Sequence, residues 1–182
     1  MPRTLPFFLI LITIYILYPT GGVAAEPGIT AAGVRGGFQA TPRKKYFHQY
    51  EAFARFGLPW EWRFDEIGIA PQIELSAGNL HSNGKDGFIG SLGPNLNLDF
   101  FDRKLDLVLG INLLYIMERS YDGQDFGNNL MFGAHIGLDY LLFSGLKAGY
   151  RFQHMSLNKI LYDHNRPNPG LDMHMFSLSW QF

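Results

Sequence analysis

The sequence predicts an all-β fold, an eight-stranded antiparallel transmembrane β-barrel of the outer membrane. Of its 182 residues, 47% are hydrophobic and only 17% are charged, against roughly 25% charged in an ordinary soluble domain. The mean hydropathy is nevertheless −0.03, so polar residues must dilute the apolar ones. This dilution is regular: apolar residues alternate with polar or small ones in eight segments. Each segment has about 10 to 13 residues, the length that a tilted strand needs to cross a bilayer.

The eight predicted strands are separated by connections rich in Gly, Asn, Asp and Pro, which are typical turn residues. Alternation is clearest in the third to sixth segments, where aliphatic and aromatic residues occupy almost every second position. The first two and the last two segments are weaker but complete the set. In chain order the predicted strands are Ile29–Ala40, Tyr46–Phe56, Ile67–Asn79, Phe88–Phe100, Leu105–Tyr115, Asn129–Leu141, Leu146–Asn158 and Asp172–Phe182.

The polar face of these strands decides between a membrane barrel and a soluble, lipocalin-like one. An eight-stranded barrel has an interior that side chains can just fill, so paired charges among glycines fit a polar interior without an aqueous channel. The aromatic-rich face then meets lipid, and the last residue, Phe182, belongs to it. A soluble carrier with an apolar lumen is the disfavoured alternative. The charges on the polar face are Arg35, Glu51, Arg55, Glu74, Asp99, Asp106, Asp139, Lys147 and Arg151.

Residues 1–25 are expected to be a secretory signal peptide that precedes a single β-barrel domain, residues 26–182. Arg3 supplies a positive start, Leu5–Tyr18 is an uncharged apolar run, and Val23–Ala25 has the small-x-small form of a cleavage site. The alternative is an uncleaved anchor, but the run is shorter than the roughly 20 residues of a spanning helix.

Composition excludes several other classes of protein. The chain has no cysteine, which excludes a disulfide scaffold and a cysteine-based zinc site. A formal net charge of −1 gives no electrostatic reason to expect nucleic acid. The aromatic content of 15% excludes a disordered chain. No metal-binding motif appears, so we expect neither a metal nor a cofactor, while the oligomeric state stays open.

With a periplasmic N-terminus, the loops near residues 41–45, 79–87, 118–128 and 157–171 are expected to be extracellular. Their basic residues would contact the phosphates of an anionic outer-leaflet lipid, or would simply be solvated loop charges. In the first and last loops these residues are Arg43, Lys44, Lys45, Lys159 and Arg166, and the middle loops carry Lys85 and Arg119.

A cluster of polar residues falls on the lipid face of the last two strands. Counting by twos places His154 and Ser156 on the outward face of one strand and Asp172 on that of the next. Ionisable groups that face hydrocarbon are expensive and are candidates for function. A hydroxyl, an imidazole and a carboxylate are the nucleophile, base and orienting acid of a serine hydrolase. The alternative is that these are tolerated interfacial side chains at strand ends.

Two segments near the C-terminus resemble a known family. Tyr150-Arg-Phe-Gln-His-Met-Ser156 and Arg166-Pro-Asn-Pro-Gly-Leu-Asp172, followed by an aromatic-ended strand, resemble the lipid A 3-O-deacylase (acyloxyacyl hydrolase-like) family of outer-membrane barrels. Fainter similarity extends to Leu58-Pro-Trp-x-Trp62 and Ser76-Ala-Gly78.

This resemblance implies an outer-membrane serine esterase that removes an ester-linked acyl chain, at position 3, from lipid A of lipopolysaccharide. It implies His154 as general base, Ser156 as nucleophile and Asp172 as orienting acid, with Asn168 stabilising the oxyanion. The chain departs from the family in having Asp172 where Glu is usual. It also has Leu157 directly after the serine, where Asn is usual, so that Asn158 follows one position later and is a weaker candidate. The alternative function is a non-catalytic barrel with a structural or interaction role.

The other histidines are weaker candidates for the site. His135 is expected to be a satisfied interior histidine beside Asp139, whereas His48 and His81 at strand ends and His164 in the last loop are expected to be solvated. Because His174 shares the lipid face with Asp172, it would compete for that carboxylate.

Overall fold

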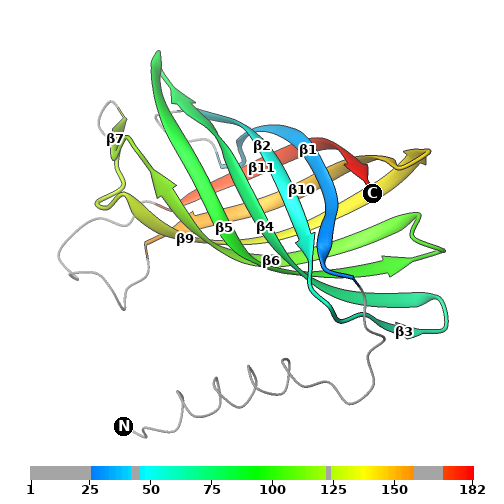
Figure 1. Ribbon diagram of the computed structural model, residues 1–182. Helices are drawn as coiled ribbons and strands as arrows, with labels where there is room; N and C mark the ends of the chain where they lie inside the picture. The colour runs from blue at the N-terminus through cyan, green and yellow to red at the C-terminus, as the bar shows by residue number, and fades with distance from the viewer. Residues whose placement is uncertain (1–25, 42–45, 122–123, 158–169) are drawn as a thin grey trace, which may run out of the picture.

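A computed structural model describes residues 26–41, 46–121, 124–157 and 170–182 as a closed antiparallel barrel (Figure 1). Eight long strands form the wall, and three short strands lie at its two ends. The short strands are β3 (Trp62–Phe64), β7 (Ser120–Tyr121) and β8 (Gln124–Asp125). The long strands are β1 (Gly28–Gln39), β2 (Phe47–Gly57), β4 (Ile67–Ser82), β5 (Lys85–Phe100), β6 (Leu105–Ile116), β9 (Leu130–Phe143), β10 (Leu146–Ser156) and β11 (Leu171–Gln181).

The barrel closes because the first long strand pairs with the last. β1 pairs antiparallel with β11 on one side and with β2 on the other. Around the rest of the wall, β2 pairs with β4 and the remaining long strands pair with their neighbours in chain order. Each long strand therefore has two partners, and no long strand presents a free edge to the bilayer. The predicted fold class is confirmed.

The observed strands agree with the predicted ones except at one connection. β4 and β5 continue past the predicted boundaries to a two-residue turn at Asn83 and Gly84, whose φ angles are 48° and 76°. Positive φ at both central residues is the geometry of the tightest hairpins. The predicted loop 79–87 is therefore wrong, because its polar residues continue the ladder. Lys85 begins β5, and its Nζ lies 2.7 Å from Oε2 of Glu118, so it is not a free loop cation.

The outer wall is apolar and the charged residues lie inside, as the alternation predicts. Most outward positions of the long strands carry exposed aliphatic or aromatic side chains, such as Ile136 and Tyr140 on β9. All nine charged side chains predicted for the interior are at most 6% exposed. No helix within the described residues is both long enough and apolar enough to cross a membrane.

One carboxylate joins most of the interior charges. Glu74 accepts hydrogen bonds from Arg35 at 2.8 Å, from Arg55 at 3.0 Å and from both terminal nitrogens of Arg151 at 2.8 Å. Arg35 also binds Glu51, and Arg55 binds Asp139 at 2.6 Å. The network thus joins five of the eight long strands through paired charges, which satisfies groups that would be costly to bury alone.

The interior is not polar along its whole length, which corrects the expectation of a polar interior. At the end where β10 stops and β11 starts, called the loop end below, the barrel is filled by apolar side chains. Met155 and Met173 contribute from the wall, and the segment after β6 adds Tyr121 and Phe126, which are buried against Phe47. This apolar plug closes the loop end above the ionic network.

We expect the Glu74 network to dominate the response of the fold to charge removal. Glu74→Gln leaves three buried guanidinium groups without their shared anion and should cost about 3–5 kcal/mol of unfolding free energy. The measurement is urea unfolding of the refolded protein in detergent micelles. Glu61→Gln, which removes an exposed pair with Arg103, is the matched control and should cost about 0–1 kcal/mol. Equal unfolding free energies for the two variants would contradict this view of the interior.

Candidate active site

The site lies on the outer wall of the two C-terminal strands. β10 and β11 pair in a register that sets His154 directly opposite Asp172. Gly170, with a φ of +48°, lies just before β11, and a left-handed conformation there is favourable for glycine. Side chains directly opposite each other on one face of an antiparallel pair are close enough to interact. The register alone therefore brings the imidazole and the carboxylate together.

The contact between these two side chains is a short hydrogen bond. Nδ1 of His154 lies 2.5 Å from Oδ1 of Asp172, and the side chains are 50% and 27% exposed. A carboxylate bound at Nδ1 fixes the orientation of the ring and leaves Nε2 for a second partner. This is the relation between base and orienting acid in serine hydrolases.

Ser156 stands two residues beyond His154 on the same face of β10 and is half-buried, opposite Phe132 of β9. Among the described residues, no hydrogen bond joins its hydroxyl to His154, so the structure pairs two of the three predicted residues and sets the third beside them. Catalytic hydrogen bonds are often long or poorly aligned before substrate binds. The spacing of i and i+2 leaves the hydroxyl on the same side of the wall as the imidazole.

His174, the weaker candidate that shares the lipid face with Asp172, does not compete for that carboxylate in the structure. Its Nδ1 lies 2.7 Å from the hydroxyl of Tyr150, and its ring contacts Phe38 and Phe152 at centroid distances of 5.6 and 5.8 Å. Parity placed His174 and Asp172 on one face correctly. The register, which was not available from parity, pairs His174 with Phe152 and leaves Asp172 to His154.

The remaining histidines divide between the interior and the outer wall. His135 is buried inside the barrel as expected, but neither ring nitrogen has a hydrogen-bond partner among the described residues, so it is not the satisfied histidine that was predicted. His81 is not simply solvated, since its Nδ1 lies 2.9 Å from Oδ1 of Asp86. His48 packs edge-on against Tyr46, with ring centroids 5.0 Å apart.

The described part of the chain holds no group of three or more His, Asp or Glu side chains arranged for a metal ion.

Several predicted site residues lie outside the described residues. The residues that cannot be placed are the oxyanion candidates Asn168 and Asn158, the predicted phosphate contacts Arg43, Lys44, Lys45, Lys159 and Arg166, and His164.

Fold and site together define a class of protein: an outer-membrane β-barrel that carries a hydrolase-like histidine–carboxylate pair on its lipid-facing wall. A sequence model described as "Lipid A 3-O-deacylase (PagL)" matches residues 48–181, which is most of the chain. The chain therefore belongs to the lipid A 3-O-deacylase family, as the resemblance implied. With its apolar outer wall, it is an integral protein of the outer membrane.

Two relatives agree with this membership. The chain is 34% identical over 73 residues to lipid A deacylase PagL of Bordetella bronchiseptica, a match that covers 40% of this chain and 39% of that relative. The match thus spans about two fifths of the relative's length. The crystal structure of the outer membrane enzyme PagL has the same fold, with a TM-score of 0.67 and 14% identity, over 83% of this chain and 99% of that one.

The His154–Asp172 contact can be tested without any activity assay. In protein labelled with 15N at histidine and refolded in micelles, we expect neutral His154 to carry its proton on Nδ1, with a downfield proton signal from the bond to Asp172. Asp172→Ala should abolish that signal. Asp86→Ala, which removes the carboxylate beside His81, should leave it in place. A downfield signal of His154 that persists in Asp172→Ala would show that the pair is not formed.

Proposed function

We propose that this protein is a serine esterase of the outer membrane that hydrolyses the ester-linked acyl chain at position 3 of lipid A. The observation that carries the proposal is the His154–Asp172 hydrogen bond on the outer wall, with Ser156 beside it on the same face. Family membership supports the same reaction and substrate. The substrate's acyl chains would already lie against this wall, so the bilayer itself would position the ester.

The proposed reaction uses the three side chains in their usual order. Nε2 of His154 accepts the proton of the Ser156 hydroxyl as its oxygen attacks the ester carbonyl. Asp172, bound at Nδ1, stabilises the imidazolium that forms. The tetrahedral intermediate collapses to an acyl-enzyme, and the imidazolium returns its proton to the departing sugar oxygen. Water, deprotonated by the same imidazole, then releases the fatty acid and restores the serine.

The shorter side chain of Asp172 is compatible with this role. The family usually has glutamate at this position, which is one methylene longer. In this chain the carboxylate stands directly opposite His154 in the strand register and lies 2.5 Å from its ring nitrogen. Because the register already brings the two backbones together, an aspartate spans the gap.

Three further assignments belong to the proposal and concern residues outside the described ranges. Residues 1–25 would direct export and be removed, which leaves residues 26–182 as the barrel domain. Asn168, with a weaker contribution from Asn158, would donate a hydrogen bond to the oxyanion. The basic residues Arg43, Lys44, Lys45 and Arg166 would contact the phosphates of lipid A, with the loop end facing the cell exterior.

The decisive experiment is mass spectrometry of lipid A from cells that express the protein. Wild type should produce lipid A lacking one ester-linked acyl chain at position 3, and Ser156→Ala should leave lipid A intact. Ser120→Ala, which changes an exposed serine outside the site, should behave as wild type. Identical acyl patterns for wild type and Ser156→Ala would refute the enzyme. Failure of a serine-directed phosphonate to label Ser156 would favour the non-catalytic barrel.

Substitutions of Asp172 should separate the effect of its charge on kcat from the effect of its side-chain length. Asp172→Asn keeps the side-chain size but removes the charge, and loss of the corresponding acid in a serine protease lowers kcat by about 10⁴. We expect a fall of at least a hundredfold in kcat here, measured on a soluble ester in micelles. Asp172→Glu, with the family's usual residue, should keep kcat within about tenfold of wild type. A kcat for Asp172→Asn equal to that of wild type would exclude Asp172 from the triad.

A further inference from the structure

The outer wall from β11 through β1 and β2 to β4 has two features that the proposed esterase does not use, an apolar groove and, beside it, a polar patch that extends to β5. From their arrangement we propose that this wall binds a second glycolipid molecule of the outer leaflet, separate from the one at His154. The acyl chain of that lipid would lie in the groove and its sugar headgroup on the patch. This inference goes beyond the proposed reaction, because it assigns a site that binds a lipid without catalysing a reaction on it.

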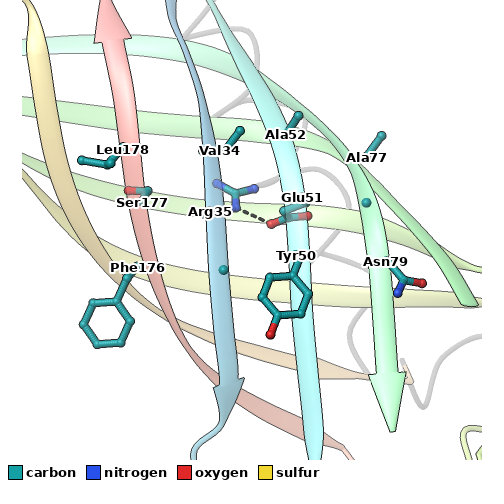
Figure 2. A pocket seen from close by; sticks show the side chains of 12 residues that line it. Val34, Arg35, Tyr50, Glu51, Ala52, Ala77, Asn79, Phe176, Ser177 and Leu178 are labelled. Atoms are coloured by element: carbon teal, nitrogen blue, oxygen red, sulfur yellow. Dashed lines mark hydrogen bonds and ion pairs between the residues drawn. The ribbon is translucent and has the colours of Figure 1, made fainter. Parts of the chain in front are cut away.

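The groove has a volume of about 670 Å³, which is within the usual range of ligand sites. Ala52 and Ala77 stand side by side across β2 and β4 and form its floor together with Gly36. Tyr50 and Phe176 project from the strands on either side of β1 (Figure 2). Small side chains between large ones thus create a depression in an otherwise bulky apolar wall.

Gly36 keeps the groove open at its centre. A Cβ atom at this position would stand 3.1 Å from the ring of Tyr50, closer than side chains normally pack. Beneath the floor, Arg35 and Glu51 form the interior ion pair drawn in Figure 2, so the groove cannot deepen into the barrel. The depression is therefore a shallow, fixed feature of the wall, open to lipid along its length.

The patch lies next to the groove, toward the loop end, and consists of Tyr46 just before β2, His48 on β2, Asn79 and His81 on β4, and Asp86 on β5. Strand register brings it together, because His48 is opposite His81, and His81 is opposite Asp86. Asp86 accepts hydrogen bonds from Asn79 at 2.6 Å and is 2.9 Å from the ring of His81. Tyr46 is 44% exposed, so its ring remains open to a ligand.

The chemistry of the patch suits a sugar. Exposed aromatic and imidazole rings offer flat faces to the C–H groups of a pyranose, while the amide and carboxylate offer a donor and acceptors for its hydroxyls. The His81–Asp86 pair repeats the arrangement of His154 and Asp172. However, the residues two positions either side of His81 are Asn79 and Asn83, so no serine stands where Ser156 stands. The patch is equipped for binding and not for ester hydrolysis.

The polar patch lies away from the catalytic pair. Its residues His48 and His81 are on β2 and β4, the third and fourth strands from β10 around the wall, which at about 4.8 Å per strand is roughly 14 to 19 Å. The groove itself is nearer, because Phe176 of β11 lines one side of it, so it is the position of the headgroup on the patch that calls for a separate molecule. The rings of Phe38 and His174 fill the wall between the two sites. A second copy of this chain is the other occupant to consider. The succession of an apolar groove and a polar patch toward the membrane surface matches a lipid better.

Native mass spectrometry of the full chain in detergent tests the proposal. The Ser156→Ala background prevents hydrolysis, and the probe is lipopolysaccharide with a truncated core. The parent should bind two molecules. The groove-filling variant Ala52→Leu/Ala77→Leu and the patch variant His48→Ala/His81→Ala should each raise one Kd at least tenfold and leave the other unchanged. Ala54→Leu, a lipid-facing change on β2 outside the groove, should keep both sites.

Three results would overturn the inference. The first is that the groove-filling variant binds two molecules with unchanged Kd values. The second is that phosphatidylglycerol competes at this site as well as lipopolysaccharide does, and the third is that a protein dimer is lost on groove filling. Heat-modifiable migration of each variant verifies that the barrel is folded. The esterase assay with Ser156 intact is independent: if hydrolysis fails while the second adduct persists and responds to groove filling, this inference stands and the proposed function does not.

Discussion

The carboxylate of Glu74 is the point on which the barrel depends. Three guanidinium groups from β1, β2 and β10 meet it inside the barrel, where water cannot screen or replace their partners. Removing one member of such a network strands the others, and this costs far more than the net stabilisation of any single pair. The network also joins strands that are distant in sequence. Arg35 of β1 and Arg151 of β10 both bind Glu74, so the network ties together the two strands that flank β11 in the wall.

A filled interior leaves only the outside for function. Within the described residues, the ionic network occupies the middle of the barrel and the apolar plug fills the loop end, which leaves no room there for a lipid substrate. Chemistry must then be built on the lipid-facing side, where polar groups are costly except near the interface. His154 and Asp172 lie at strand ends, where that cost is lowest. The hydrogen bond between the two side chains lowers this cost further. The same contact therefore makes the polar pair tolerable at the membrane surface and orients the imidazole ring.

The sequence was sufficient for the fold and for which face each residue occupies, because alternation with period two is a local property. It predicted the interior charges and the outward placement of His154 and Asp172. Pairings across strands were harder, since parity says nothing of register. Parity left His174 free to bind Asp172, whereas the register sets His174 opposite Phe152, and its ring bonds to the hydroxyl of Tyr150. The apolar plug was also missed, although its signal was present. Near the loop end the inward positions of β10 and β11 become apolar, as at Met155 and Met173, while the outward positions become polar, so the alternation inverts there.

The apolar plug has a further consequence for the mechanics of the barrel. Its side chains come from the wall, at Met155 and Met173, and from the segment after β6, at Tyr121 and Phe126. Because these side chains pack tightly together, they support from inside the strand ends that carry His154 and Asp172. The pair on the outer surface therefore stands on a solid core and not on the rim of a hollow tube.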